Sequence, residues 1–218
     1  MEESLETFHR AKNLAQQLLT LSKGGSPVKK LTSLKEVVEK NVKFSLSGSS
    51  VKLNLSIQDN LWPCEIDENQ ISQVINNIVI NARQAMQNGG QIDVSVSNIS
   101  IEEEIKYELL EGNYVKISIK DYGSGISQEN MGKIFEPFFT TKKDGSGLGL
   151  AIAHSIINKH KGKIVVESEF GKWTQFDIYL PASPDKKIIS NKMLENKKFE
   201  GKGKILIMDD DVSVQNVV

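Results

Sequence analysis

Asn77-Ile-Val-Ile-Asn81 lies within a strongly amphipathic run, which is the clearest indication of a secondary-structure element in this sequence. Asp67 is expected to cap the start of this run, with Gln70 three residues later, and Gly89-Gly90 is expected to end it. Between these limits apolar residues recur at helical spacing, namely Ile71, Val74, Ile75, Ile78, Ala82 and Ala85. The sequence therefore predicts a helix over about residues 67 to 87 with one buried face.

Amide side chains run along the border of that apolar stripe. Asn77 and Asn81 are four residues apart and so share one face of the helix, and Gln84 follows one turn further on. An amide oxygen in such a place can ligate Mg²⁺, a hard cation that also shares phosphate oxygens. An ordinary amphipathic helix also carries polar border residues, so this row alone does not specify a ligand site.

The second pattern is Asp121-Tyr-Gly-Ser-Gly125, which follows an alternating, strand-like stretch. Glycine at positions 123 and 125 lets a flat ring approach the backbone without a Cβ in the way. The carboxylate of Asp121 can accept a charge-assisted hydrogen bond from an exocyclic amine. Asp and Gly also dominate plain turns, which is the alternative interpretation.

The third pattern, Gly145-Ser-Gly-Leu-Gly-Leu150, runs directly into an apolar helix expected over about Leu148 to Lys161. Free N–H groups at the start of a helix suit phosphate. The pattern is neither a Walker A loop, which ends in Gly-Lys-Ser/Thr, nor a dinucleotide-binding fingerprint, because its spacing differs and no strand precedes it. A flexible hinge before a helix would have a similar composition.

Taken in this order, the three patterns and the segment Phe135-Glu-Pro-Phe-Phe-Thr-Thr-Lys142 resemble the ATP-binding catalytic domain of sensor histidine kinases. The wider group contains DNA gyrase B, MutL and the heat-shock chaperone ATPases. The resemblance covers about residues 4 to 181. It implies an α+β fold, a two-layer α/β sandwich in which a mixed sheet carries three helices on one face and is preceded by a further helix.

The resemblance also implies ATP and Mg²⁺ as cofactors. Asn81 would hold Mg²⁺, Asn77 and Gln84 the phosphates and Asp121 the adenine amine, while the segment from Phe135 to Lys142 would begin a mobile lid. The residues expected to bind ATP are Asn77, Asn81, Gln84, Asp121, Gly123, Gly125, Ile126, Phe135, Thr141, Lys142, Ser146, Gly147, Leu148, Gly149, Leu150 and Thr174. One departure concerns the turn before the last strand, where Trp173 stands in place of the family's small, glycine-containing turn and leaves the role of Thr174 open.

Alternating residues predict the strands of the sheet. The expected strands are Val42 to Leu46, Val51 to Ile57, Gln91 to Ser97, Tyr114 to Lys120, Lys163 to Ser168 and Thr174 to Leu180, with a charged, solvated insertion from Glu102 to Glu111.

The expected organisation has four parts. Residues 1–25 resemble the second helix of a dimerisation and phosphotransfer hairpin, with an apolar stripe over residues 4 to 22, and residues 26–181 form the ATP-binding domain. Residues 182–203 have the polar, Lys-rich composition of a linker, and residues 204–218 resemble the first strand of a truncated receiver domain.

The phosphorylated histidine is expected to lie outside this chain. Kinases of the resembled type phosphorylate a histidine followed by an acid or similar polar residue, whereas His9 is followed by Arg10 and Ala11. His154 and His160 lie in the helix after the glycine loop, where packing or solvation explains them. The implied partners are ATP, the histidine-bearing helical hairpin of the same protein, the receiver domain of a response regulator and, for the full-length protein, a second copy in a homodimer.

Composition narrows the function further. With 27 Lys and Arg against 28 Asp and Glu, the chain has no basic field to attract nucleic acid or anionic lipid. The single Cys64, the lack of a signal-like start and the lack of a membrane-length apolar run predict a cytoplasmic location.

Two alternative functions stay open. One is an ATPase switch, which needs a water-activating acid that the stretch from Ile71 to Gln87 lacks, and the other is a docking module with a vestigial nucleotide site.

Overall fold

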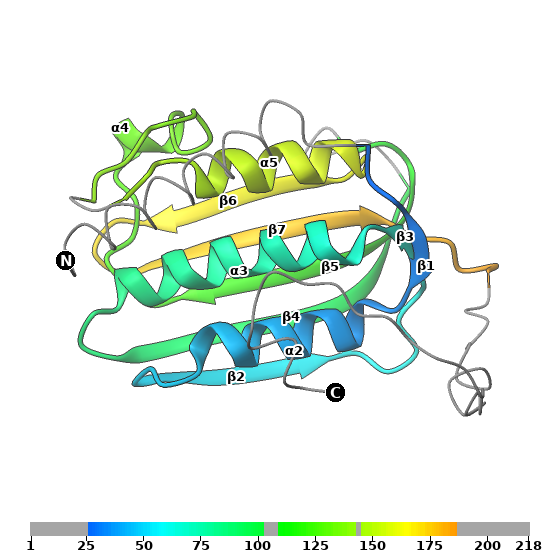
Figure 1. The fold of residues 1–218 in the computed structure, drawn as a ribbon, viewed down its shortest axis with the longest axis horizontal. Coiled ribbons are helices and arrows are strands. Elements are labelled where there is room, and N and C mark those ends of the chain that lie inside the picture. Colours follow the sequence, from blue (N-terminus) through cyan, green and yellow to red (C-terminus); the bar gives the residue numbers. More distant parts are fainter. Residues whose placement is uncertain (1–25, 103–108, 143–144, 187–218) are drawn as a thin grey trace, which may run out of the picture. The chain divides into compact units, whose positions relative to one another are not determined.

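The computed structural model describes residues 26–102, 109–142 and 145–186. Its elements are β1 (Lys30–Thr32), α2 (Leu34–Leu46), β2 (Val51–Ile57), β3 (Cys64–Ile66), α3 (Glu68–Ala85), β4 (Gly90–Ile101), β5 (Gly112–Asp121), α4 (Gln128–Met131), α5 (Gly149–Lys159), β6 (Lys163–Glu169) and β7 (Trp173–Pro181) (Figure 1). The expected helix over residues 4 to 22, His9 and the receiver-like strand lie outside the described residues.

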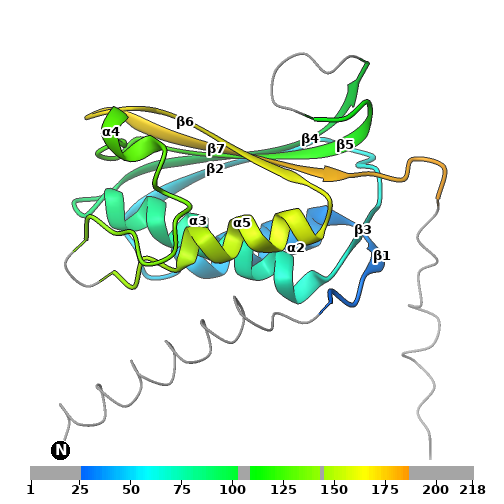
Figure 2. The same cartoon turned by 90° about the horizontal axis from the view of Figure 1, so that it is seen from above.

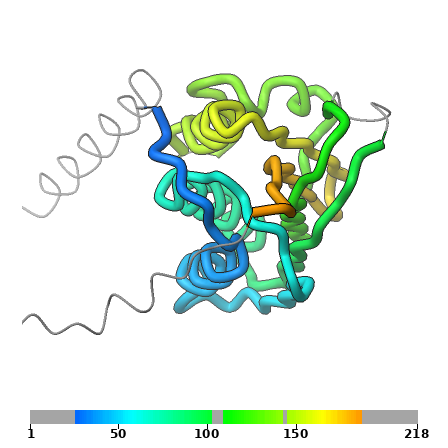
Figure 3. Tube along the Cα trace, turned by 90° about the vertical axis from the view of Figure 1, so that its right-hand side faces the viewer, coloured from blue at the N-terminus to red at the C-terminus, as the bar shows by residue number. Residues whose placement is uncertain are grey.

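The main sheet has the strand order β2-β4-β5-β7-β6. β2 pairs with β4 in parallel, and the other neighbours pair antiparallel, so the sheet is mixed. Helices α2, α3 and α5 lie on one face of it (Figure 2), side by side with α3 in the middle (Figure 1). Figure 3 looks along these helices, which stand in one layer beside the sheet. The expected two-layer sandwich with three helices on one face is confirmed.

Helix α3 forms as its pattern predicts. The carboxylate of Asp67 accepts hydrogen bonds from the backbone N–H groups of Asn69 and Gln70, which satisfies two donors that the first turn leaves unpaired. The apolar stripe is buried against the sheet and the flanking helices from Ile71 to Ala82, and Ala85 at its end is half-buried. Burying such side chains is worth about 1.5–3 kcal/mol each, so packing holds the amide row of α3 at the edge of the core.

The prediction of a strand over Val42 to Leu46 is wrong, because these residues form the last turns of α2. The stretch from Val42 to Leu46 is too short to distinguish the periodicity of a helix from that of a strand. When Leu34, Val37 and Val38 are included, the buried positions recur at helical spacing, and they face α3. The expected strands at residues 91 and 114 are present but longer than predicted, since β4 and β5 pair along their full lengths.

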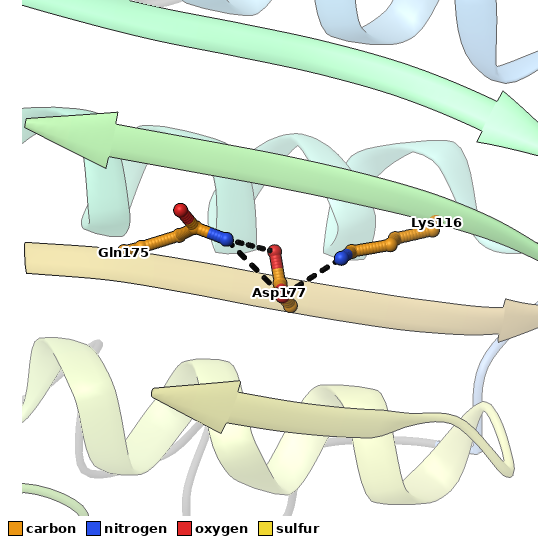
Figure 4. A network of polar contacts seen from close by, with 3 residues as sticks. All are labelled: Lys116, Gln175 and Asp177. Atoms are coloured by element: carbon orange, nitrogen blue, oxygen red, sulfur yellow. Dashed lines mark hydrogen bonds and ion pairs between the residues drawn. The ribbon is translucent and has the colours of Figure 1, made fainter. Parts of the chain in front are cut away.

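The face of the sheet opposite the helices has its own polar network (Figure 4). Lys116 on β5 forms an ion pair with Asp177 on β7, with 2.9 Å between Nζ and Oδ2. The side-chain amide of Gln175 donates to both carboxylate oxygens of Asp177, at 3.1 and 3.3 Å. The network therefore joins two neighbouring strands on the side away from the helices.

A two-stranded sheet, β1 with β3, was not predicted from the sequence, because strands of three residues carry too little pattern. Val28, just before β1, donates its backbone N–H to the capping carboxylate of Asp67 at 3.0 Å. The small sheet therefore anchors the chain before α2 to the beginning of α3. No helix within the three described ranges is both long and apolar enough to cross a membrane.

Candidate functional site

A cavity of about 820 Å³ lies beside α3 and is also lined by residues of the segment between β5 and α5. The predicted site residues that line it are Asn77, Asn81, Gln84, Asp121, Gly125, Ile126, Thr141, Lys142, Ser146, Gly147, Gly149, Leu150 and Thr174. These residues come from parts of the chain up to 97 positions apart, as the numbers of Asn77 and Thr174 show (174 − 77). The fold brings most of the predicted set to one hollow.

One end of the cavity is built around Asp121, the last residue of β5. Its side chain is 4% exposed, and Oδ1 accepts the backbone N–H of Gly123 at 3.0 Å. Burial raises the pKa of Asp121 to about 6, against the lowering effects of the Gly123 hydrogen bond and of the charge on Lys142. Gly123 packs so closely that a Cβ there would lie 2.7 Å from the Cβ of Ala85. The turn after β5 therefore aims a buried acceptor into the cavity.

Thr174 lies opposite Asp121 in the β5–β7 ladder, so the two side chains share the face of the sheet that carries the helices. Its hydroxyl lies 3.1 Å from Oγ of Ser168, and that oxygen accepts the backbone N–H of Ile126 at 2.8 Å. Trp173 points to the other face, where Lys120 lies 4.3 Å from its ring centroid. The tryptophan therefore leaves Thr174 on the cavity wall.

The amide row of α3 forms the other wall. The side chain of Asn77 donates from Nδ2 to the carbonyl oxygen of Gly149 at 2.9 Å, which joins α3 to the first residue of α5. Further along the helix, Oδ1 of Asn81 and Oε1 of Gln84 accept hydrogen bonds from Nζ of Lys142, at 3.2 and 2.7 Å. Two amide oxygens one turn apart thus converge on one cationic nitrogen.

That convergence meets one requirement of a site for a hard cation, namely oxygen atoms that point to one place. Amide oxygens are suitable Mg²⁺ ligands when phosphate oxygens and water complete the shell. No cluster of three or more His, Cys, Asp or Glu side chains with metal-site geometry occurs within the described ranges. Burial lowers the pKa of Lys142, and the charge of Asp121 opposes that effect.

The glycine loop is pinned to the segment before it. The backbone N–H of Phe138 donates to the carbonyl oxygen of Gly147 at 3.0 Å. Gly147 has φ +67°, and a Cβ there would lie 2.4 Å from the carbonyl carbon of Phe138, so only glycine fits this position. Helix α5 begins directly afterwards, with Leu148 fully buried at its N-cap. Gly149 and Leu150 of its first turn line the cavity. The N–H groups that the first turn of a helix leaves without intrahelical partners suit an anion.

Three predicted residues do not line the cavity. Gly123 donates its backbone N–H to the carboxylate of Asp121, and Leu148 is buried in the core at the start of α5. Phe135 packs against the core and stacks on His154, with 5.0 Å between the ring centroids. Phe135 was expected to bind ATP, but the aromatic residue of its segment that lines the cavity is Phe139.

Several lining residues were not predicted. They are Ile80, Ala82, Ala85, Ser124, Ser127, Asn130, Ile134, Phe139, Thr140, Gly145, Phe170 and Phe176. Residues next to predicted ones could have been found by extending each motif by a position or two. Phe170 had no such signal, since it lies in the turn between β6 and β7 and reaches the cavity only through strand pairing. Within the described lining, Asp121 is the only acid.

Comparison with known proteins identifies similar chains. Residues 66–184 match the family described as histidine kinase-, DNA gyrase B-, and HSP90-like ATPase. Sensor kinase CckA of Brucella abortus (strain 2308) is 34% identical over 96% of this chain and 24% of its own length. Sporulation kinase E of Bacillus subtilis (strain 168) is 40% identical over 61% of this chain and 16% of its own length.

Solved structures are similar as well. The catalytic domain of histidine kinase ThkA superimposes with a TM-score of 0.59 at 28% identity, covering 73% of this chain and 99% of that one. This chain spans about a quarter or less of the length of sensor kinase CckA and of sporulation kinase E.

Proposed function

The chain belongs to the histidine kinase-, DNA gyrase B- and HSP90-like ATPase family, as an ATP-binding catalytic domain of the sensor histidine kinase type, and from that premise we propose that it transfers the γ-phosphoryl group of Mg·ATP to a histidine on a helical hairpin of the same protein. In this reaction a histidine ring nitrogen forms a bond to the γ-phosphorus. The bond from that phosphorus to the bridging oxygen breaks, and ADP leaves.

The observation that supports the proposal is the chemistry of the polar groups that line the cavity. Asp121 offers a buried acceptor at one end, where the exocyclic amine of adenine would bind. Lys142, Gln84 and the start of α5 offer donors and a cation, which the phosphates would contact. Phosphoryl transfer depends on positioning and charge neutralisation more than on covalent help from the protein.

Asn81 would hold Mg²⁺, while Asn77 and Gln84 would face the phosphates. When bound, the ion neutralises charge on the phosphate oxygens. Asn77 also ties the start of α5 to α3, so the same side chain would keep the N–H groups of that helix aimed at the phosphates. Lys142 contacts the same amide oxygens and would shift to a phosphate when the metal takes its place.

An ATPase switch is less well supported. Hydrolysis in that class needs an acid to activate water, and the described cavity wall carries no acid on α3. In the full-length protein the domain would act in the cytoplasm, as part of a homodimer, and the receiver domain of a response regulator would take the phosphoryl group from the histidine.

The test uses the chain with a separately produced histidine-bearing hairpin of the same full-length kinase. We expect γ-labelled ATP to transfer an acid-labile label to the hairpin in the presence of Mg²⁺ and to leave the chain itself unlabelled. The Asn81→Ala variant should abolish transfer. Release of inorganic phosphate without labelled hairpin would favour the ATPase switch, and absence of nucleotide binding would favour a docking module.

A further inference from the structure

The turn between β6 and β7 carries a phenylalanine to the rim of the cavity. Phe170 is 71% exposed and yet lines the cavity. The turn that holds it is tied down twice. The backbone N–H of Gly171 donates to the carbonyl oxygen of Ser124 at 2.8 Å. The backbone N–H of Lys172 donates to the carbonyl oxygen of Glu169 at 3.0 Å. The ring therefore stands on a fixed backbone that is attached to the loop after Asp121.

This turn lies at the Asp121 end of the cavity. Asp121 is opposite Thr174 in one ladder, and Glu169 is opposite Trp173 in the next, so the turn extends from the same part of the sheet. Gly125, at φ +64°, touches the turn so closely that a Cβ there would lie 2.2 Å from the carbonyl oxygen of Glu169 and 2.9 Å from Cα of Phe170. The turn and the loop after Asp121 therefore form one continuous wall.

This wall has two features of a base-binding site. One is a group that forms hydrogen bonds with the edge of the base, and the other is an aromatic ring for the face of the base. The carboxylate of Asp121 can read the edge of a flat heterocycle through hydrogen bonds. A phenyl ring at the same end can stack on the face of that heterocycle, and such stacking is insensitive to the pattern of donors and acceptors on its edge. An exposed aromatic ring is not unusual in itself, since Phe44 on α2 is 77% exposed. Phe170 differs in that it lines the cavity, whereas Phe44 does not.

We propose that Phe170 stacks on the purine ring of the bound nucleotide and is a base-binding residue of this site, a proposal that rests on the ATP-binding function above. Phe170 adds affinity for any purine base, while Asp121 adds affinity for adenine in particular.

The experiment measures ATP affinity, in the presence of Mg²⁺, for the intact chain and for four variants. Phe170→Ala and Phe170→Leu remove the π-face, Phe170→Tyr keeps it, and Phe44→Ala is the control for losing an exposed phenyl ring away from the cavity. We expect the alanine and leucine variants to bind ATP roughly 5- to 150-fold more weakly, from the usual worth of one base–aromatic stack. The tyrosine variant and Phe44→Ala should bind like the wild type.

Leucine covers nearly as much apolar surface as phenylalanine, so ATP binding by Phe170→Leu at the wild-type level would overturn the stacking. Weak binding by Phe170→Tyr would overturn it as well, because the ring would then be present without effect. Either result leaves ATP binding by the wild type intact. If the wild type itself fails to bind ATP, the proposed function fails, whatever the variants do. Thermal melting of each variant checks that the fold is kept, and the Leu–Tyr pair decides the matter if the alanine variant does not fold.

Discussion

The backbone N–H of Asp67 donates to Nε2 of His160 at 3.0 Å, which joins the beginning of α3 to the end of α5. These are the two helices that flank the cavity. The other ring nitrogen, Nδ1, lies 2.8 Å from the carbonyl oxygen of Ile156. Since Nε2 accepts and Nδ1 donates, the buried ring is neutral and holds one tautomer. The contact is structural, and it makes a helix junction sensitive to protonation.

We expect His160 to make the domain less stable in mild acid. Burial lowers the pKa of His160, with help from the charge of Lys29 and against the Ile156 carbonyl and the charge of Asp67. The unfolded chain then binds the proton more readily, so this contribution is complete above the unfolded pKa of about 6.5 and is lost as pH falls below it. Urea unfolding should be measured at several pH values. The unfolding free energy of His160→Gln should fall less steeply in acid than that of the wild type. An unchanged slope would contradict the junction's role.

Asp121 should act on stability in the opposite direction. Its pKa is raised to about 6 by burial, so the folded state holds the proton more tightly and stability falls as pH rises through the range from about 4 to 6. Replacing it with asparagine removes that penalty. We therefore expect Asp121→Asn to melt at a higher temperature than the wild type at pH 7.5, with the difference shrinking in acid. Equal melting temperatures at pH 7.5 would show that the carboxylate is well solvated.

The same substitution should change nucleotide preference. A carboxylate only accepts hydrogen bonds at neutral pH, and adenine presents an amine where guanine presents a carbonyl oxygen. A hydrogen bond to a charged group is worth about 1.5–3 kcal/mol, so Asp121→Asn should weaken ATP binding roughly 10- to 150-fold and spare GTP. Competition binding on both proteins measures this. Wild-type protein that holds GTP as tightly as ATP would show that Asp121 does not read the base.

Lys142 should matter most when Mg²⁺ is absent. Its ammonium contacts the amide oxygens of Asn81 and Gln84, where the metal is proposed to bind. With the metal chelated, this cation would be left to neutralise the phosphates, so Lys142→Met should weaken ATP binding about 10-fold with chelator and less with Mg²⁺. Lys43→Met, which removes an exposed ion pair on α2, is the control. An equal loss under both conditions would argue against overlap of the two cations.

Asn77 and its neighbour Asn76 offer a matched pair on α3. Asn77 bonds to Gly149 at the cavity, whereas Asn76 accepts the hydroxyl of Ser45 on α2 at 2.8 Å. Each bond contributes about 0.5–1.5 kcal/mol, so alanine at either position should lower the unfolding free energy by a similar amount. Only Asn77→Ala should also weaken ATP binding, because it frees the start of α5. Chemical denaturation and ATP titration separate the two effects.

Asp177 provides a substitution that should affect stability alone. Its side chain is 8% exposed and holds Lys116 and Gln175 on the face of the sheet away from the cavity. Asp177→Ala should cost about 1.5–3 kcal/mol of unfolding free energy, since it removes charged hydrogen bonds from a buried place. ATP affinity measured well below the melting temperature should stay at the wild-type value. A fall in affinity would mean that the two faces of the sheet are coupled.

Local signals predicted much of the fold and of the site. The cap at Asp67, the stripe of α3 and the alternation in β5 and β7 each depend on neighbours within a few positions, so their elements could be predicted. The segment from Val42 to Leu46 was misread because a short apolar run fits both periods, and packing against α3 decided between them. β1 and β3 exist only through pairing with each other.

The sequence by itself determined which chemistry is available: amides on one face of a helix, an acid beside glycines that admit a flat ring, and a glycine loop opening a second helix. Only the tertiary structure decided which of these groups meet. Strand register set Thr174 opposite Asp121, and the fold seated Lys142 on the amide row. It also turned Phe135 away toward His154 and carried Phe170 to the cavity. The physical reason is that periodicity and capping are local, whereas register, burial and the closure of loops depend on contacts between residues far apart in the chain.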